Sequence, residues 1–117
     1  MHTNNNFMKA CIEKCWECRD ECQDVLFNHC LEEGGTHAEA AHVKLMTDCI
    51  QICQISADFM VRNSEMHSAT CTACADICDA CANSCEAVGG EEMKRCAELC
   101  RECASSCRSM DEVKKAA

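Results

Sequence analysis

The chain has 117 residues, enough for one domain around one core, and it carries sixteen cysteines, no proline and a formal net charge of −9. Its lysines and arginines do not gather into a patch that could follow a phosphate backbone, which excludes nucleic acid as a partner. No window of about twenty apolar residues exists that could span a membrane, so no membrane partner is expected.

The spacing of apolar residues and cysteines is helical along the whole chain, and the absence of proline permits long helices. We expect an all-α fold in a single domain over residues 1–117, built from helices at about 4–33, 36–62, 64–88 and 91–113. Short links between such helices favour an antiparallel up-and-down four-helix bundle with a cysteine-lined core.

Turn signals separate these helices. The pairs Gly34-Gly35 and Gly89-Gly90 are expected to end the first and third helices, because glycine readily takes the left-handed conformation. Thr36 and Glu39 have the spacing of a capping box, which predicts the start of the second helix. Asn63-Ser64 is expected to cap the third helix, and two glutamates suit the positive N-terminus of the fourth.

The cysteines form one stripe on each helix. Their steps of three and four residues confine each set to an arc of roughly 60–80°, the seam that should face the bundle axis. The second helix has only two cysteines, but His42, Met46, Ser56 and Met60 continue its stripe. In the first helix His29 falls on the stripe and Cys30 lies to its side. The predicted metal ligands are Cys11, Cys15, Cys18, Cys22, Cys30, Cys49, Cys53, Cys71, Cys74, Cys78, Cys81, Cys85, Cys96, Cys100, Cys103, Cys107, His29, His42 and Met46.

Two structural explanations for the stripes are weaker than metal binding. Buried free cysteine is a small hydrophobe, but sixteen of them bury little apolar area and pack a core poorly. A disulfide between residues four apart, such as Cys11 and Cys15, would need Cβ atoms closer than a helix holds them. Disulfides between helices stay open as an alternative.

The thiol pattern favours copper(I). Seven Cys-x-x-x-Cys pairs each point two sulfurs toward one ion, and copper(I) prefers soft thiolate and thioether ligands. Thiolates that bridge two ions would give a capacity of about one ion per cysteine. Sixteen thiolates would add −16 to the net charge of −9, and sixteen monovalent ions would neutralise that addition. Zinc prefers isolated Cys₄ sites on loops, so a zinc or mixed soft-metal store is the alternative.

The runs CTACADICDACANSC at 71–85 and CAELCRECASSC at 96–107 resemble the bacterial copper storage proteins, and the resemblance extends over all four helices. It implies a four-helix bundle, a core of bridging copper(I)–thiolate sites and assembly into tetramers. The polar segment Met1–Asn6 has no apolar signal sequence, so the chain resembles the leaderless, cytoplasmic branch of that family. The second helix, with two cysteines, is poorer than the family pattern.

Residues at the two ends of the bundle have different expected roles. His29, Cys30, His42 and Met46 should lie beside both double-glycine turns, and we expect copper to enter there. Met8, Met60, His67 and Met110 should gather at the opposite end, as metal ligands or as a hydrophobic plug.

A second apolar stripe on the second helix predicts a homo-oligomer. Leu45, Ile52, Ile55 and Phe59 lie to one side of the cysteine seam, where a lone bundle has little use for them. The absence of a glycine-rich loop or a single distinctive thiol argues against an enzyme. A thiol redox protein is the alternative of another class, and it would show one cysteine that reacts far faster than the rest.

Overall fold

The computed structural model describes residues 2–116 of the chain, with the side chains of residues 6–110. The described residues form helices and no strands. The elements are α1 (His2–Val25), the π-helix η1 (Leu26–Cys30), α2 (Leu31–Glu33), the 3₁₀ helix η2 (Gly35–Ala38), α3 (Ala40–Val61), α4 (His67–Val88) and α5 (Glu91–Ala116). Because α1, η1 and α2 continue one another, they form one long helix, and the expected four helices are confirmed.

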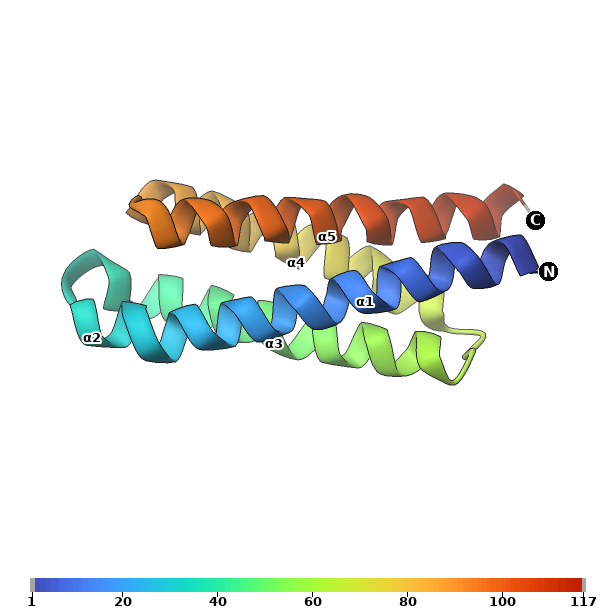
Figure 1. The fold of residues 1–117 in the computed structure, drawn as a ribbon, viewed down its shortest axis with the longest axis horizontal. Helices are drawn as coiled ribbons and strands as arrows, with labels where there is room; N and C mark the ends of the chain where they lie inside the picture. Colours follow the sequence, from blue (N-terminus) through green and yellow to red (C-terminus); the bar gives the residue numbers. More distant parts are fainter. Residues whose placement is uncertain (1, 117) are drawn as a thin grey trace.

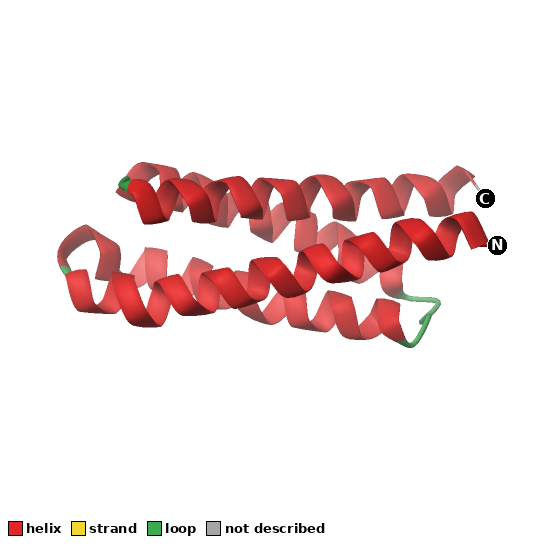
Figure 2. Ribbon diagram, viewed as in Figure 1, coloured by secondary structure: helices red, strands yellow, loops and turns green. Residues whose placement is uncertain are grey.

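The four long helices form an antiparallel bundle that measures 48 × 20 × 19 Å (Figure 1). α1 packs on α3 and α5, and α4 packs on the same two helices, so α1 and α4 are diagonal to each other. Loops are confined to the ends of the bundle, as Figure 2 shows. The N- and C-termini share one end with the α3–α4 turn, and both double-glycine turns lie at the other, which we call the glycine end (Figure 1). No described helix is both long and apolar enough to cross a membrane.

The double-glycine stops are confirmed, but the predicted capping box is wrong. Gly34 and Gly89 end their helices with positive φ angles of 72° and 85°. Thr36 lies inside the 3₁₀ turn η2, and the N-cap of α3 is Glu39 in an extended conformation. The chain completes its turn before α3 begins, so the helix starts four residues later than the Thr36 pattern predicts.

The α3–α4 turn also runs further than expected. Asn63 takes a positive φ of 54°, and the Ser64 hydroxyl accepts a hydrogen bond from the Met66 N–H at 3.1 Å. This hydroxyl orders the turn, whereas α4 itself starts only at His67.

The π-helix η1 changes which side chains of the first helix face the core. A π turn closes over five residues, so it adds one residue to the turn compared with an α-helix. Cys30 therefore takes the core position after Leu26 and is fully buried, while His29 lies at the edge and is half-buried. The expectation that His29 occupies the seam and Cys30 lies beside it is wrong, because it assumed an unbroken α-helical register.

The core consists mainly of sulfur. All sixteen cysteines are buried. Alanines such as Ala57, Ala82 and Ala104 fill the space between the stripes, and few large apolar side chains are fully buried. The largest of these are Leu26, Met46, Met60, Met93 and Met110. A core of this composition buries little hydrocarbon, so hydrophobic burial alone does not explain it.

Candidate metal centre

Every cysteine of the chain is a free, buried thiol, placed on the bundle axis by its helix. The predicted stripes on α1, α3, α4 and α5 all face inward. Because residues three and four apart lie on the same face of a helix, each Cys-x-x-x-Cys pair presents two sulfurs to the same region of the core.

Thiols from different helices approach one another closely. Cys22 Sγ lies 3.5 Å from Cys96 Sγ, and Cys49 Sγ lies 3.7 Å from Cys78 Sγ. Near the termini, Cys11 Sγ lies 3.7 Å from Cys107 Sγ. Such contacts let one thiolate bridge two ions held by neighbouring helices, which is the arrangement that a multinuclear soft-metal core needs.

Twelve of the cysteines fall into four groups whose Sγ atoms all lie within 4.8 Å of one another. The groups are Cys15, Cys74, Cys103 and Cys107; Cys18, Cys53, Cys78 and Cys103; Cys18, Cys22, Cys49 and Cys100; and Cys11, Cys71 and Cys107. Cys18, Cys103 and Cys107 each belong to two groups, so the groups form one connected network along the bundle. Three of the groups bring four thiols together from helices and not from loops.

At the glycine end, a mixed cluster replaces pure thiolate. Cys30 Sγ lies 3.6 Å from His42 Nε2, 4.0 Å from Met46 Sδ and 3.7 Å from Met93 Sδ. The fully buried Met93 was missed in the sequence. Its position three residues before Cys96, in phase with the α5 stripe, could have revealed it.

His42 is oriented for metal binding. Its Nδ1 lies 2.8 Å from the Ser84 hydroxyl, and its Nε2 faces Cys30. Burial lowers the pKa of His42 below the usual 6.5, so the neutral imidazole is favoured. In the tautomer whose Nδ1–H donates to the Ser84 hydroxyl, the Nε2 lone pair is free, and this is the form that ligates a metal.

The structure does not place His29 within this cluster. His29 Nε2 lies 3.8 Å from Glu92 Oε1, and its ring meets the ring of His37 edge-on at 5.1 Å. His37 is half-buried. The glycine end therefore has an inner sulfur–imidazole cluster and an outer group of two imidazoles and a carboxylate.

The end near the termini is closed by thioethers. Met8, Met60 and Met110 are buried there, and Met60 Sδ lies 3.7 Å from Cys71 Sγ. His67 belongs to the α3–α4 turn, where its Nδ1 donates a hydrogen bond to the Ser64 carbonyl at 2.8 Å. The expected gathering therefore includes the methionines, whereas His67 is engaged in the α3–α4 turn.

The pKa values of the core thiols are shifted in opposite directions. Contact with Cys100 lowers the pKa of Cys18, and the same contact raises the pKa of Cys100. At the glycine end, burial raises the pKa of Cys30 from 9.0 to about 11. Metal binding at Cys30 must therefore displace a proton, as it must at any neutral thiol.

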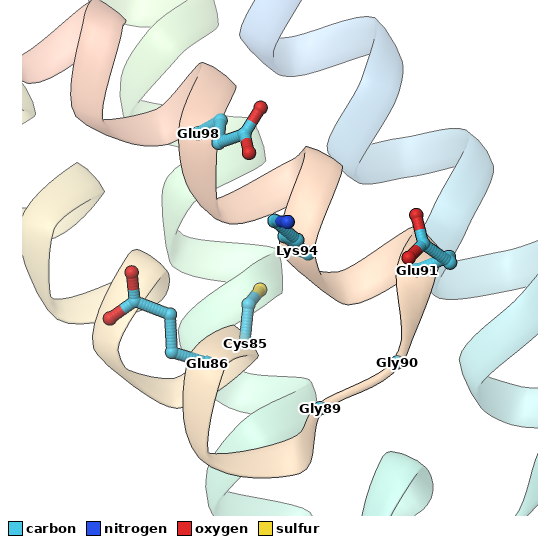
Figure 3. Close-up of a pocket in the computed structure, with 7 residues that line it drawn as sticks. All are labelled: Cys85, Glu86, Gly89, Gly90, Glu91, Lys94 and Glu98. Carbon is cyan, nitrogen blue, oxygen red and sulfur yellow. The ribbon is translucent and has the colours of Figure 1, made fainter.

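A surface hollow of about 600 Å³ lies over the α4–α5 turn (Figure 3). Its lining includes the carboxylate residues Glu86, Glu91 and Glu98 as well as Lys94. Cys85 also lines the hollow, as Figure 3 shows, although its relative exposure is 0%. The hollow brings the outer surface close to one end of the α4 stripe.

Comparison with known proteins agrees with this architecture. The 45%-identical Nmul_A1745 protein from Nitrosospira multiformis superposes with a TM-score of 0.89, over 93% of this chain and 98% of that one. The Cu(I)-bound copper storage protein BsCsp3 is 34% identical, with a TM-score of 0.83 over 90% and 98% of the two chains. Apo-Csp3 from Bacillus subtilis is 35% identical, with a TM-score of 0.79 over 88% and 97%.

One further relative and one protein family also match the sequence of this chain. The cysteine-rich protein YhjQ of Bacillus subtilis is 36% identical over 71 residues, which is 61% of this chain and 65% of the relative's own length. The family described as "Copper storage protein" matches residues 4–112 of this chain. With its bundle and its sulfur core, this chain belongs to the copper storage protein family.

Proposed function

We propose that this chain stores many copper(I) ions inside its bundle through bridging cysteine thiolates. The observation that carries the proposal is the connected network of buried thiols, whose Sγ atoms lie within bridging distance across helices. Similarity to the Cu(I)-bound BsCsp3 structure supports the choice of ion. Charge supports the capacity, because about sixteen monovalent ions would neutralise sixteen thiolates.

Anaerobic titration with copper(I) against a competing chelator tests this function. The fully reduced protein should take up about one equivalent per cysteine. Saturation at only one to four ions would contradict storage. A final state in which zinc displaces copper(I) from the core would favour the alternative of a zinc store.

We propose that copper enters at the glycine end. His42, Met46 and Met93 offer neutral ligands around Cys30, and they should hold copper(I) less tightly than bridging thiolates do. His29 and His37 lie outside this cluster, where they would meet an incoming ion first. The buried thioethers at the other end form a plug.

The rate of copper loading tests which end of the bundle admits the ion. Replacement of His29 and His42 by Ala, together with Met46→Leu, should slow copper uptake and its removal by chelator while capacity stays nearly unchanged. The matched variant carries Met60→Leu and Met110→Leu at the opposite end. Slower exchange in that variant alone would show that copper passes through the end near the termini.

We further propose a cytoplasmic homotetramer that acts without catalysis. The exposed apolar side chains of Trp16, Phe27 and Ile55 offer a surface for a second copy. The family resemblance supplies the number four. A thiol redox enzyme would need one thiol that reacts far faster than the rest, and twelve of the sixteen thiols share one network instead.

A further inference from the structure

One of the four thiol groups is a tetrahedron with five nearly equal edges. Cys18 and Cys22 come from α1, Cys49 from α3 and Cys100 from α5. Five of the six Sγ–Sγ distances are 3.9 Å for Cys18–Cys49, 3.7 Å for Cys18–Cys100, 4.0 Å for Cys22–Cys49, 3.6 Å for Cys22–Cys100 and 3.9 Å for Cys49–Cys100. The sixth pair, Cys18 and Cys22, lies within 4.8 Å.

These edges match a four-coordinate divalent ion. Zinc binds thiolate at about 2.3 Å with tetrahedral geometry, which requires sulfurs about 3.8 Å apart. We propose that the copper-free protein binds one zinc-class divalent ion at Cys18, Cys22, Cys49 and Cys100. This second metal class goes beyond copper(I) storage, because bridging copper(I) does not need four sulfurs around a single ion.

Thiol hydrogen bonds distinguish the proposed site from the other groups. They join five of its six pairs, whereas in the group of Cys15, Cys74, Cys103 and Cys107 they join Cys15 to Cys103 and to Cys107, at 3.8 Å each. The group of Cys18, Cys53, Cys78 and Cys103 shares Cys18 with the proposed site, so the two groups cannot be filled together. We expect the first divalent ion to take the group with five nearly equal edges.

The binding step involves no change of oxidation state. The four thiols form bonds to the ion and lose their four protons to solvent, which leaves a site with a charge of −2. That charge is buried among apolar and thiol side chains, which is costly. Copper(I) ions that neutralise every thiolate avoid this cost, so copper(I) should displace the divalent ion.

Cobalt(II) is the probe for this site, added to the reduced apo-protein without oxygen. The first equivalent should produce the visible bands of tetrahedral cobalt(II) and the charge-transfer band of four thiolates. Cys22→Ser and Cys49→Ser should each weaken this first step at least tenfold, since both residues belong to this group alone. Cys85→Ser is the matched control, because Cys85 belongs to none of the groups, and it should bind like the wild type.

Two results would overturn the site: a first equivalent of cobalt without four-thiolate spectra, or equal affinity in the wild type and both test variants. Circular dichroism of each apo-variant checks that the bundle has formed. A copper(I) titration on the same samples tests storage separately. Full copper capacity without the cobalt site would reject this inference and leave the storage function intact.

Discussion

Cys85 is the thiol that lines the surface hollow of the glycine end. That hollow lies over the α4–α5 turn, and the other cysteines do not line it. Contact with Cys81 and Cys96, together with burial, raises the pKa of Cys85, so its absolute reactivity should be below that of a free cysteine. Access, rather than acidity, should decide which thiol of the folded protein reacts first.

We expect iodoacetamide at limiting dose to label Cys85 of the reduced apo-protein before the other fifteen cysteines. Peptide mass mapping after short reaction times measures the order. Loading with copper(I) should protect Cys85, because a thiolate bound to metal is a poor nucleophile. Earlier labelling of Cys11 or Cys71 would show that the end near the termini opens more readily than the hollow.

Neutral buried thiols make the apo-protein sensitive to alkali. Burial raises the pKa of Cys30 from 9.0 to about 11, and the pKa of Cys71 is also about 11. At Cys71, contact with Cys107 lowers the pKa, while contact with Cys11 and burial raise it by more. Between pH 9 and 11 the folded state keeps protons that the unfolded chain releases, so stability falls as pH rises through this window.

Urea unfolding of the reduced apo-protein at pH 8, 9, 10 and 11 should show this loss. Each such thiol contributes at most about 1.4 kcal/mol per pH unit. Cys30→Ser should make the decline shallower, since serine does not titrate in this range. A stability that is constant from pH 9 to 11 would mean that the core thiols are already ionised in the folded apo-protein.

At the scale of the elements, one glycine in each double-glycine turn has a conformation that other residues avoid. Gly34 has φ 72° and ψ −159°, and Gly89 has φ 85° and ψ 174°. This region is populated almost only by glycine. A Cβ at either position would meet no atom within 4 Å, so a substitution is costly because of the backbone and not because of crowding.

Gly89→Ala should therefore lower the free energy of unfolding of the apo-protein by about 1–3 kcal/mol. Gly35→Asn is the matched control, because Gly35 has φ 57° and asparagine accepts that region, as Asn63 does at 54°. Chemical unfolding of both variants gives the comparison. Equal losses of stability in the two variants would contradict a special backbone requirement at Gly89.

The fold was predictable because its signals are local. Helical spacing, two double-glycine stops and inward cysteine stripes all follow from the order of residues along the chain. The π turn at Leu26–Cys30 was not predictable, because the α-helical register was assumed to hold. That one extra residue exchanged the roles of His29 and Cys30.

The candidate site was predictable only in part. The seam positions of the cysteines followed from periodicity, but the groups of thiols did not. Which sulfurs meet depends on the rotation of each helix and its shift along the axis, and these are set by packing between helices. The tetrahedron of Cys18, Cys22, Cys49 and Cys100 joins three helices, so no single segment of sequence contains it.

At the scale of the whole molecule, the second apolar stripe divides into two parts. Ile52 is partly buried against the core, and Arg62 covers the ring of Phe59 at 4.5 Å. Ile55 has 43% of its surface exposed, and Trp16 on α1 has 39%. Ile55 is therefore the member of the stripe that a neighbouring copy would bury.

Ile55→Glu should weaken assembly, because a buried unpaired carboxylate at an interface is unfavourable. Light scattering at micromolar concentration should report a tetramer for the wild type and smaller species for this variant. Met66→Glu, at another exposed apolar residue, should leave the assembly unchanged. Copper capacity should stay the same in both variants, and a wild-type monomer would contradict the proposed tetramer.

The long, narrow shape of the core affects the order in which stored ions leave. The sulfur column runs along a bundle 48 Å long and about 20 Å wide, and buried methionines close one end. If copper(I) passes only through the glycine end, as we propose, ions would advance from one helical turn to the next, about 5.4 Å at a time. Such a column would release first the copper that arrived last, and the oldest ions would stay deepest. A pulse of one stable copper isotope followed by another should come out in reverse order.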